Sequence, residues 1–229
     1  MTDVAALIPA AGAGQRLGLG PKAFVSLGGV TLLERALALL APHAEELIVA
    51  VPAGFEEEAR RLAARTTSAG AGAARQVTVL RGGATRQATV ERLLAASDAA
   101  WIVVHDAARP LTPPEVVARV LEAARRHGAA TAVLPVADTL HDVAADVAVA
   151  REELRSVQTP QAFSRVILER AHVSARQAAR EASDDAQLVR ALGHPVATVH
   201  GSPWSHKLTG PEDLPWLEAL AFARTRVRG

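Results

Sequence analysis

The sequence predicts an α/β protein with a doubly wound, mostly parallel sheet and an inserted β-hairpin arm. Short apolar runs that end at turn residues alternate along the chain with longer segments of helical apolar spacing. Glycines and charged residues follow the ends of these runs, as they do at the ligand-binding edge of a parallel sheet. A stretch of period-two alternation over residues 137–159 interrupts this pattern and predicts the hairpin.

The elements follow in order from their local sequences. Strands are expected at residues 4–8, 46–51, 77–80, 100–104, 130–136 and 196–199. Helices are expected at residues 31–40, 56–64, 84–96, 113–126, 164–180, 183–192 and from 211 onward. We expect residues 1–229 to form one domain. Because a two-stranded ribbon is marginal in water, the arm should pack on the parent domain or on a second subunit.

Composition excludes several classes of function. A net charge of +1 and 3% aromatic residues argue against a nucleic-acid binder, which needs basic patches or stacking platforms. The chain has no cysteine, so disulfide, thiolate and zinc-thiolate chemistry is excluded. A signal peptide and a membrane-spanning apolar run are both missing from the sequence, so we expect a cytoplasmic protein with no membrane partner.

The glycine-rich loop after the first strand carries Arg16 and Lys22. Gly12 and Gly14 lack Cβ atoms, so the backbone N–H groups of this loop can lie against a polyphosphate. A dinucleotide-binding fingerprint needs a glycine where Leu17 stands, and a Walker A loop needs a hydroxyl residue directly after its lysine. The loop is therefore either another kind of phosphate-binding loop or a plain turn with two solvated cations.

The scarcity of lysine favours the first interpretation. The chain has two lysines, Lys22 and Lys207, against 23 arginines. Both lie in loop-like segments. Chance could explain the position of either lysine alone, but it explains both together less well, and a functional site would require a compact ammonium group that a planar guanidinium does not replace. These lysines are candidates for a functional site.

Polar residues also follow the expected strand at residues 100–104, in the run His105 to Pro110. Asp106 alone could be a turn or capping residue, a commoner role than metal binding. His105 is more simply a packed or hydrogen-bonded histidine than a ligand. Neither an H-E-x-x-H nor a G-x-S-x-G motif occurs, so zinc and acyl-transfer chemistry lack support.

These segments together resemble the 2-C-methyl-D-erythritol 4-phosphate cytidylyltransferase family of the non-mevalonate isoprenoid pathway, over the full length of the chain. The segments that carry the resemblance include Pro9-Ala-Ala-Gly-x-Gly-x-Arg16, Gly82-Gly83-x-x-Arg86-x-x-Thr89, His105-Asp-Ala-Ala-Arg-Pro110, Ser183-Asp-Asp-Ala186 and Lys207-x-Thr209-x-Pro211-Glu-Asp-Leu214. The resemblance implies a fold like that of nucleotide-diphospho-sugar transferases, and transfer of CMP from CTP to methylerythritol phosphate.

The resemblance also implies roles for individual residues. Catalytic roles are expected for Arg16, Lys22, Arg151 and Lys207. Contacts with the nucleotide are expected from Pro9, Ala10, Ala11, Gly12, Ala13, Gly14, Gly83, Thr89, Asp106 and Ala107. Contacts with methylerythritol phosphate are expected from Asp106, Arg109, Thr139, Arg151, Thr159, Ser183 and Lys207. Asp106 is further expected to bind Mg²⁺ or another divalent cation, and the arm to join a homodimer in which Arg151 reaches the neighbouring subunit's substrate.

Two alternatives remain open at this point. A ribitol-phosphate cytidylyltransferase, or an enzyme for another polyol phosphate, would use nearly the same loop and acceptor chemistry. A non-catalytic nucleotide sensor on the same fold is a more distant alternative, disfavoured by the presence of both Arg16 and Lys22.

Overall fold

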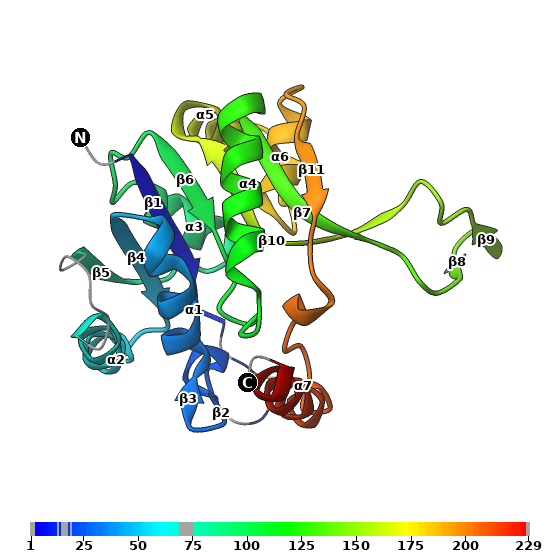
Figure 1. Cartoon of the computed structure of the whole chain (residues 1–229). Helices are drawn as coiled ribbons and strands as arrows, with labels where there is room; N and C mark the ends of the chain where they lie inside the picture. The colour runs from blue at the N-terminus through cyan, green and yellow to red at the C-terminus, as the bar shows by residue number, and fades with distance from the viewer. Residues whose placement is uncertain (1–2, 13, 15–17, 19, 69–75, 228–229) are drawn as a thin grey trace.

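The computed structural model describes every residue except 1–2, 13, 15–17, 19, 69–75 and 228–229. Its centre is a seven-stranded sheet with the order β11-β7-β10-β6-β1-β4-β5 (Figure 1). The strands are β1 (Val4–Pro9), β4 (Glu46–Val51), β5 (Gln76–Arg81), β6 (Trp101–Val104), β7 (Ala129–Pro135), β10 (Arg155–Ser164) and β11 (Ala197–His200). Strand β10 is antiparallel to both neighbours, and every other neighbouring pair is parallel, which confirms the predicted mostly parallel sheet.

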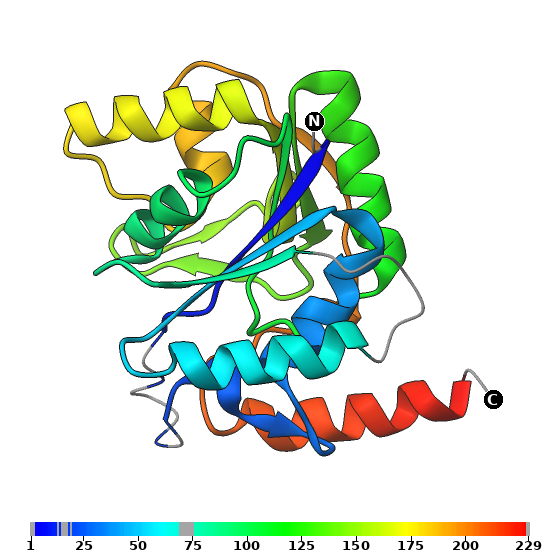
Figure 2. The ribbon, with the colours of Figure 1, turned by 90° about the vertical axis from the view of Figure 1, so that its left-hand side faces the viewer.

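Helices cover both faces of this sheet (Figure 2). One face carries α1 (Leu32–Leu40), α2 (Glu56–Ser68) and α4 (Pro114–His127). The other carries α3 (Arg86–Leu94), α5 (Arg165–Gln177) and α6 (Asp185–Ala191). In β1, Val4, Ala6 and Ile8 join the first core, while Ala5 and Leu7 join the second. Both faces of the strand are buried, which explains its unbroken apolar run.

Short local signals fix the helix ends. The Thr31 hydroxyl accepts a hydrogen bond from the backbone N–H of Glu34 (3.2 Å), and the Glu34 carboxylate accepts one from the backbone N–H of Thr31 (2.9 Å). This capping box starts α1. Helix α4 has Pro114 at its first position and is capped at its C-terminus by Gly128, whose φ of 82° is left-handed.

A third, smaller core joins segments from both ends of the chain beneath the main sheet. It lies between the N-terminal hairpin and α7 (Asp213–Val227), the last helix. The hairpin strands are β2 (Ser26–Leu27) and β3 (Val30–Thr31). The described part of the chain also contains the 3₁₀ helices η1 (Lys22–Phe24), η2 (Ala41–His43) and η3 (Pro203–Ser205). The buried members of this core are Val25, Leu27, Leu32, Leu111, Leu208 and Leu217.

The arm consists of β8 (Leu140–Asp142) and β9 (Val147–Val149), joined by a turn. It extends away from the body of the molecule in Figure 1, and Val143 and Val147 at its tip are 86% and 52% exposed. The expected boundary at residue 159 is wrong, because residues 155–159 belong to β10. That strand lies between β6 and β7 inside the main sheet and was not predicted.

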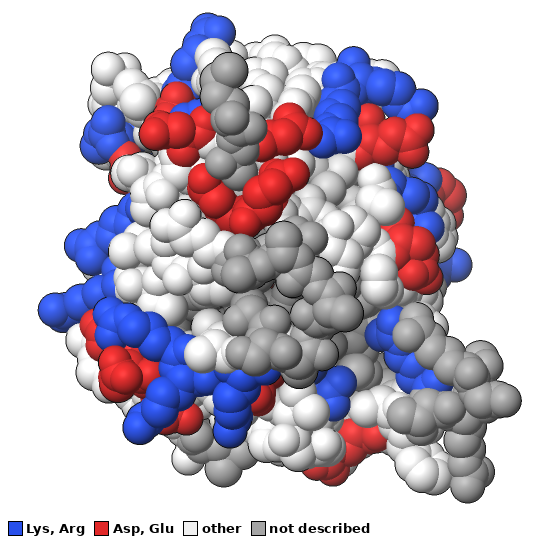
Figure 3. All heavy atoms as spheres, turned by 60° about the vertical axis from the view of Figure 1, so that its left-hand side comes forward, with Lys and Arg blue, Asp and Glu red and all other residues white. Residues whose placement is uncertain are grey.

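Charges of both signs are interspersed on the face drawn in Figure 3. The described residues of that face therefore show no single-sign basic patch of the kind that binds nucleic acid. Among the described helices, none combines the length and apolar character needed to cross a bilayer.

Candidate active site

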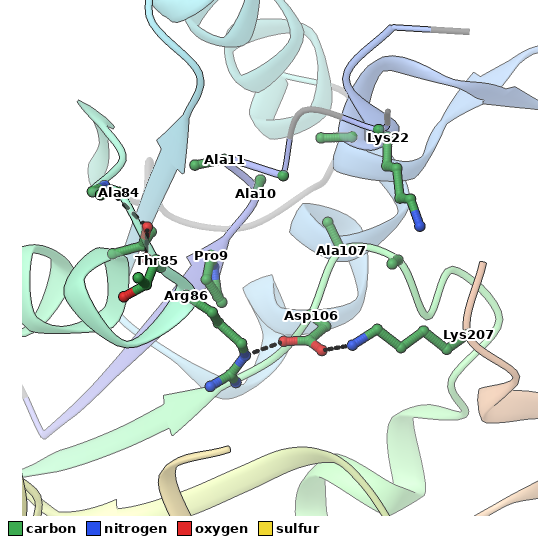
Figure 4. A pocket seen from close by; sticks show the side chains of 16 residues that line it. Pro9, Ala10, Ala11, Lys22, Ala84, Thr85, Arg86, Asp106, Ala107 and Lys207 are labelled. Atoms are coloured by element: carbon green, nitrogen blue, oxygen red, sulfur yellow. Dashed lines mark hydrogen bonds and ion pairs between the residues drawn. The ribbon is translucent and has the colours of Figure 1, made fainter. Parts of the chain in front are cut away.

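A pocket of about 560 Å³ lies at the carboxyl ends of β1, β5 and β6, beside the N-terminus of α3 (Figure 4). This is the edge where parallel α/β sheets bind ligands. The pocket is lined by Pro9, Ala10, Ala11, Gly12, Gly14, Lys22, Ala23, Gly83, Ala84, Thr85, Arg86, Thr89, Asp106, Ala107, Ala108 and Lys207. Every described residue that was expected to contact the nucleotide is among them.

The loop after β1 forms one wall of the pocket, and this wall has only small side chains because its described lining residues are alanines and glycines. The backbone N–H of Ala10 continues the strand ladder to the Ala50 carbonyl at 2.8 Å, so the wall is anchored to β4. Gly14 has a φ of 66°, and a Cβ placed there would lie 2.1 Å from the carbonyl oxygen of Gly20. Only glycine fits this position. The expected residues Ala13 and Arg16 lie outside the described residues.

A second glycine pair after β5 brings another stretch of backbone against the pocket. A Cβ on Gly82 would lie 2.1 Å from the Cβ of Ala11, so the two loops touch there. The N–H of Gly83 donates to the Thr89 hydroxyl (3.0 Å), which donates to the Thr85 carbonyl (2.8 Å). Thr89 therefore ties the glycine loop to the first turn of α3.

Asp106 stands between two cations at the floor of the pocket. Its Oδ2 accepts from Lys207 Nζ at 2.7 Å, and its Oδ1 accepts from Arg86 Nε at 3.1 Å (Figure 4). Burial opposes ionisation of this carboxyl, but Arg86 and Lys207 outweigh burial and hold the pKa of Asp106 well below its usual range. The carboxylate is therefore charged at neutral pH, and both of its oxygens are occupied.

Lys22 reaches the segment that follows the other lysine. Its Nζ donates to the carbonyl oxygens of Leu208 (3.1 Å) and Thr209 (2.6 Å). Leu208 belongs to the small third core and directly follows Lys207. The two lysines singled out in the sequence, 185 positions apart, thus meet at one pocket.

Arg109 and Thr159 lie next to the pocket and support it without lining it. The Thr159 hydroxyl accepts from the backbone N–H of Asp106 at 3.0 Å. The guanidinium of Arg109 donates to the Ser205 carbonyl at 2.6 Å, which fixes the segment that leads to Lys207.

The remaining expected substrate residues lie elsewhere. The Ser183 hydroxyl, exposed before α6, accepts from the Gln187 side chain at 3.1 Å. Thr139 and Arg151 are exposed on the arm, where Arg151 donates to the carbonyl of Ala137. The structure therefore does not bring these three residues into the pocket of their own chain.

The described residues do not fit a resident magnesium ion. No cluster of three His, Cys, Asp or Glu side chains that could hold a metal occurs among them. Asp106 is the one carboxylate among the described lining residues, and Arg86 and Lys207 already occupy its oxygens. A role as metal ligand, expected from the resemblance, disagrees with this geometry.

Arg86 is the main residue of the pocket to which sequence reasoning gave no role. The sequence did offer a reason to select it, because Arg86 stands three residues after Gly83 in a segment that carries the family resemblance. What the sequence could not indicate is its partner, since Asp106 lies 20 residues further along the chain.

The comparisons with known proteins identify the family of this chain. The sequence model of the family described as IspD, 2-C-methyl-D-erythritol 4-phosphate cytidylyltransferase, matches residues 4–222. The enzyme of that name from Thermus thermophilus is 51% identical over 96% of this chain and 97% of its own. The one from Deinococcus radiodurans is 47% identical over 94% of this chain and 88% of its own.

Solved structures support the same conclusion. The crystal structure of 2-C-methyl-D-erythritol 4-phosphate cytidylyltransferase from Thermus thermophilus superposes with a TM-score of 0.80 at 48% identity. The match covers 96% of this chain and 98% of the other. Fold and sequence therefore agree, and the chain belongs to the 2-C-methyl-D-erythritol 4-phosphate cytidylyltransferase family.

Proposed function

We propose that the pocket described above is where this chain carries out the reaction of its family. The chain is a nucleotidyltransferase that transfers CMP from CTP to 2-C-methyl-D-erythritol 4-phosphate, in isoprenoid precursor biosynthesis. The observation that carries the assignment to the pocket is its chemistry. The described lining residues include three cations (Lys22, Arg86 and Lys207) but one carboxylate, and two glycine-rich backbone walls complete the pocket.

Such a pocket suits a reaction between two polyanions. An oxygen of the acceptor phosphate attacks the α-phosphorus of CTP, and the bond from that phosphorus to the bridging oxygen of pyrophosphate breaks. A phosphate monoester has a second pKa of about 6, so the acceptor is largely a dianion at neutral pH and needs no general base. The barrier is lowered by positioning and by fixed positive charge where the leaving group develops negative charge.

We assign the residues on this basis. We assign Lys22 to the triphosphate, because it stands at the end of the glycine-rich loop. The family resemblance assigns Arg16 to the same role. We assign Lys207, which is held by Asp106, to the acceptor phosphate. Mg²⁺ belongs to this proposal as an ion that arrives bound to the triphosphate, since Mg²⁺ usually keeps several water ligands and binds through substrate phosphates rather than in an all-protein cage. A cytoplasmic location is likewise part of the proposal.

The arm completes the proposal. A lone ribbon is marginally stable in water, and the exposed valines of the arm would be buried by a partner surface. We assign that partner to a second copy of the chain in a two-fold dimer, in which Arg151 of one subunit serves the other's pocket.

The test is pyrophosphate release by the purified protein across a panel of nucleoside triphosphates and polyol phosphates. We expect turnover with CTP and methylerythritol phosphate together, and its loss in the Lys22→Ala variant. Faster turnover with ribitol phosphate would contradict the acceptor, and full activity of Lys22→Ala would contradict the assignment to this pocket.

A further inference from the structure

The series of ion pairs Lys207–Asp106–Arg86 continues from the pocket into the protein interior, to residues that do not line the pocket. Arg86 Nη1 donates to Asp185 Oδ2 at 2.8 Å, and the other oxygen, Oδ1, lies 3.1 Å from His172 Nε2. The side chains of Asp185 and His172 are 1% and 2% exposed, and neither lines the pocket. Asp185 starts α6 and His172 lies on α5, so the series crosses from the sheet edge to the helices behind it.

Two of the three guanidinium nitrogens of Arg86 donate to two different carboxylates, while the third, Nη2, is buried with no hydrogen-bond partner among the described residues. Because Nη1 is held by Asp185, the guanidinium reaches Asp106 through Nε and contacts Oδ1. The other oxygen of Asp106 is thereby left to Lys207. A guanidinium free of Asp185 could turn its fork and bind both oxygens of Asp106, which is the geometry arginine prefers with a carboxylate.

We propose that Asp185 is a positioning residue that keeps Lys207 on Asp106 by restraining Arg86. His172 holds the second oxygen of Asp185 and so fixes which oxygen faces Arg86. In the absence of Asp185, Arg86 competes with Lys207 for Asp106, and the ammonium group leaves its place in the pocket. The inference rests on the proposed function only for its effect on turnover, since the competition itself is a property of the free protein.

The two-lysine composition of the chain permits a direct test. An acylating reagent can modify only Lys22, Lys207 and the N-terminus, and each modified peptide is separable by mass spectrometry. The rate at Lys207 divided by the rate at Lys22 reports how firmly Lys207 is held. The Asp185→Asn variant keeps the size of the side chain and removes its charge.

We expect the Lys207/Lys22 labelling ratio to rise by about threefold or more in Asp185→Asn, because an ammonium released from an ion pair is free to react. The matched control is Asp184→Asn, which removes a charge one position away. Asp184 caps α6 by accepting from the Gln187 backbone N–H, a role that asparagine also fills. Its labelling ratio should equal that of the wild type.

A double variant separates competition by Arg86 from general loosening. Arg86→Gln combined with Asp185→Asn removes the competitor together with its restraint, so the labelling ratio should return toward the wild-type value. A ratio that stays high in the double variant, or an unchanged ratio in folded Asp185→Asn, overturns the proposal.

If Asp185→Asn fails to fold, Asp185→Glu keeps the buried charge and displaces it by one methylene group. A smaller rise is expected there, and an unchanged ratio again overturns the proposal.

Turnover supplies the second readout. Asp185→Asn should lower kcat about tenfold in the wild-type background, and should have no further effect when Lys207 is already replaced by glutamine. Equal losses in both backgrounds would contradict a role exerted through Lys207. A wild-type protein without cytidylyl transfer would refute the proposed function, while the labelling result would still decide the role of Asp185.

Discussion

Asp106 in the pocket and Arg151 on the arm differ in how the chain holds their charges. The Asp106 side chain is 10% exposed, contacts two cations, and its backbone N–H donates to Thr159. Arg151 is exposed, and its guanidinium donates to a carbonyl of the same ribbon. One charge is fixed inside the chain, and the other extends away from its body.

This difference indicates which charged groups of the site are already held in position within a single chain. Electrostatic stabilisation of a transition state depends on groups that are already in place before the reaction. The pocket meets that condition through contacts between β6, α3 and the segment before α7. Under the proposed dimer, the arm meets it only after association, so substitutions in the two regions should behave differently.

The largest effect is expected for Asp106→Asn. The change releases Lys207 and leaves Arg86 with one carboxylate, so we expect turnover to fall about a thousandfold, the upper range for loss of a preorganised electrostatic contact. Steady-state pyrophosphate release measures the loss, and thermal unfolding verifies the fold. The control is Asp98→Asn, whose side chain is fully exposed and should leave turnover unchanged. Near-normal turnover of Asp106→Asn would make Asp106 a structural turn residue.

The second prediction concerns pH and the neighbouring histidine. His105 is fully buried, and burial lowers its pKa to about 4. The unfolded chain, with an ordinary histidine pKa of about 6.5, therefore binds more protons between these values. The free energy of unfolding should fall by up to about 3 kcal/mol through this group as the pH drops across that window.

His105→Asn should flatten the slope of unfolding free energy against pH, whatever its effect on stability at neutral pH. Denaturant titrations at a series of pH values measure both slopes. The pKa of Asp106 is lowered as well, so its contribution is present above the ordinary aspartate pKa and is lost only at more acidic pH. An equal slope in wild type and His105→Asn would show that the histidine does not titrate as a buried group.

The third prediction sharpens the role of the compact cation in the pocket. Lys22→Arg conserves charge but places a planar fork where an ammonium group contacts two carbonyl oxygens, of Leu208 and Thr209. We expect turnover to fall about a hundredfold with folding unchanged. Activity within about threefold of wild type would mean that any cation serves there, and would weaken the argument from lysine scarcity.

The fold was predictable wherever apolar spacing was clean, and one strand of the main sheet was missed for a physical reason. Strand β10 contains Pro160 in its middle, and its buried positions include Gln158 and Gln161. Each glutamine is satisfied by partners far along the chain: Gln158 exchanges hydrogen bonds with Ser202, and Gln161 bonds Thr131 and Ala186. The pairing register shifts between Val157 and Gln161, around the proline. A strand of this kind has no apolar pattern to detect.

The loop residues of the candidate site were predictable from the sequence, but the ion pairs between distant residues were not. The glycines and lysines carry their chemistry in short segments, so Gly14, Gly83 and Lys22 could be named in advance. The restraint of Arg86 by Asp185 depends on two side chains 99 residues apart, which only the folded sheet brings together.

The smallest expected signal comes from the experiment that compares pocket and arm most directly. If Arg151 serves the neighbouring subunit, inactive Lys22→Ala and inactive Arg151→Ala proteins should regain activity when mixed. A mixed dimer has one site with both defects and one with neither. Random exchange of equal amounts therefore restores about a quarter of wild-type activity.

Mixing Lys22→Ala with Asp106→Asn is the matched control, because both defects lie in the pocket and every site of that mixed dimer keeps one. No recovery in the first mixture, once mass spectrometry has shown that subunits exchange, would place Arg151 in its own chain's site or outside any site.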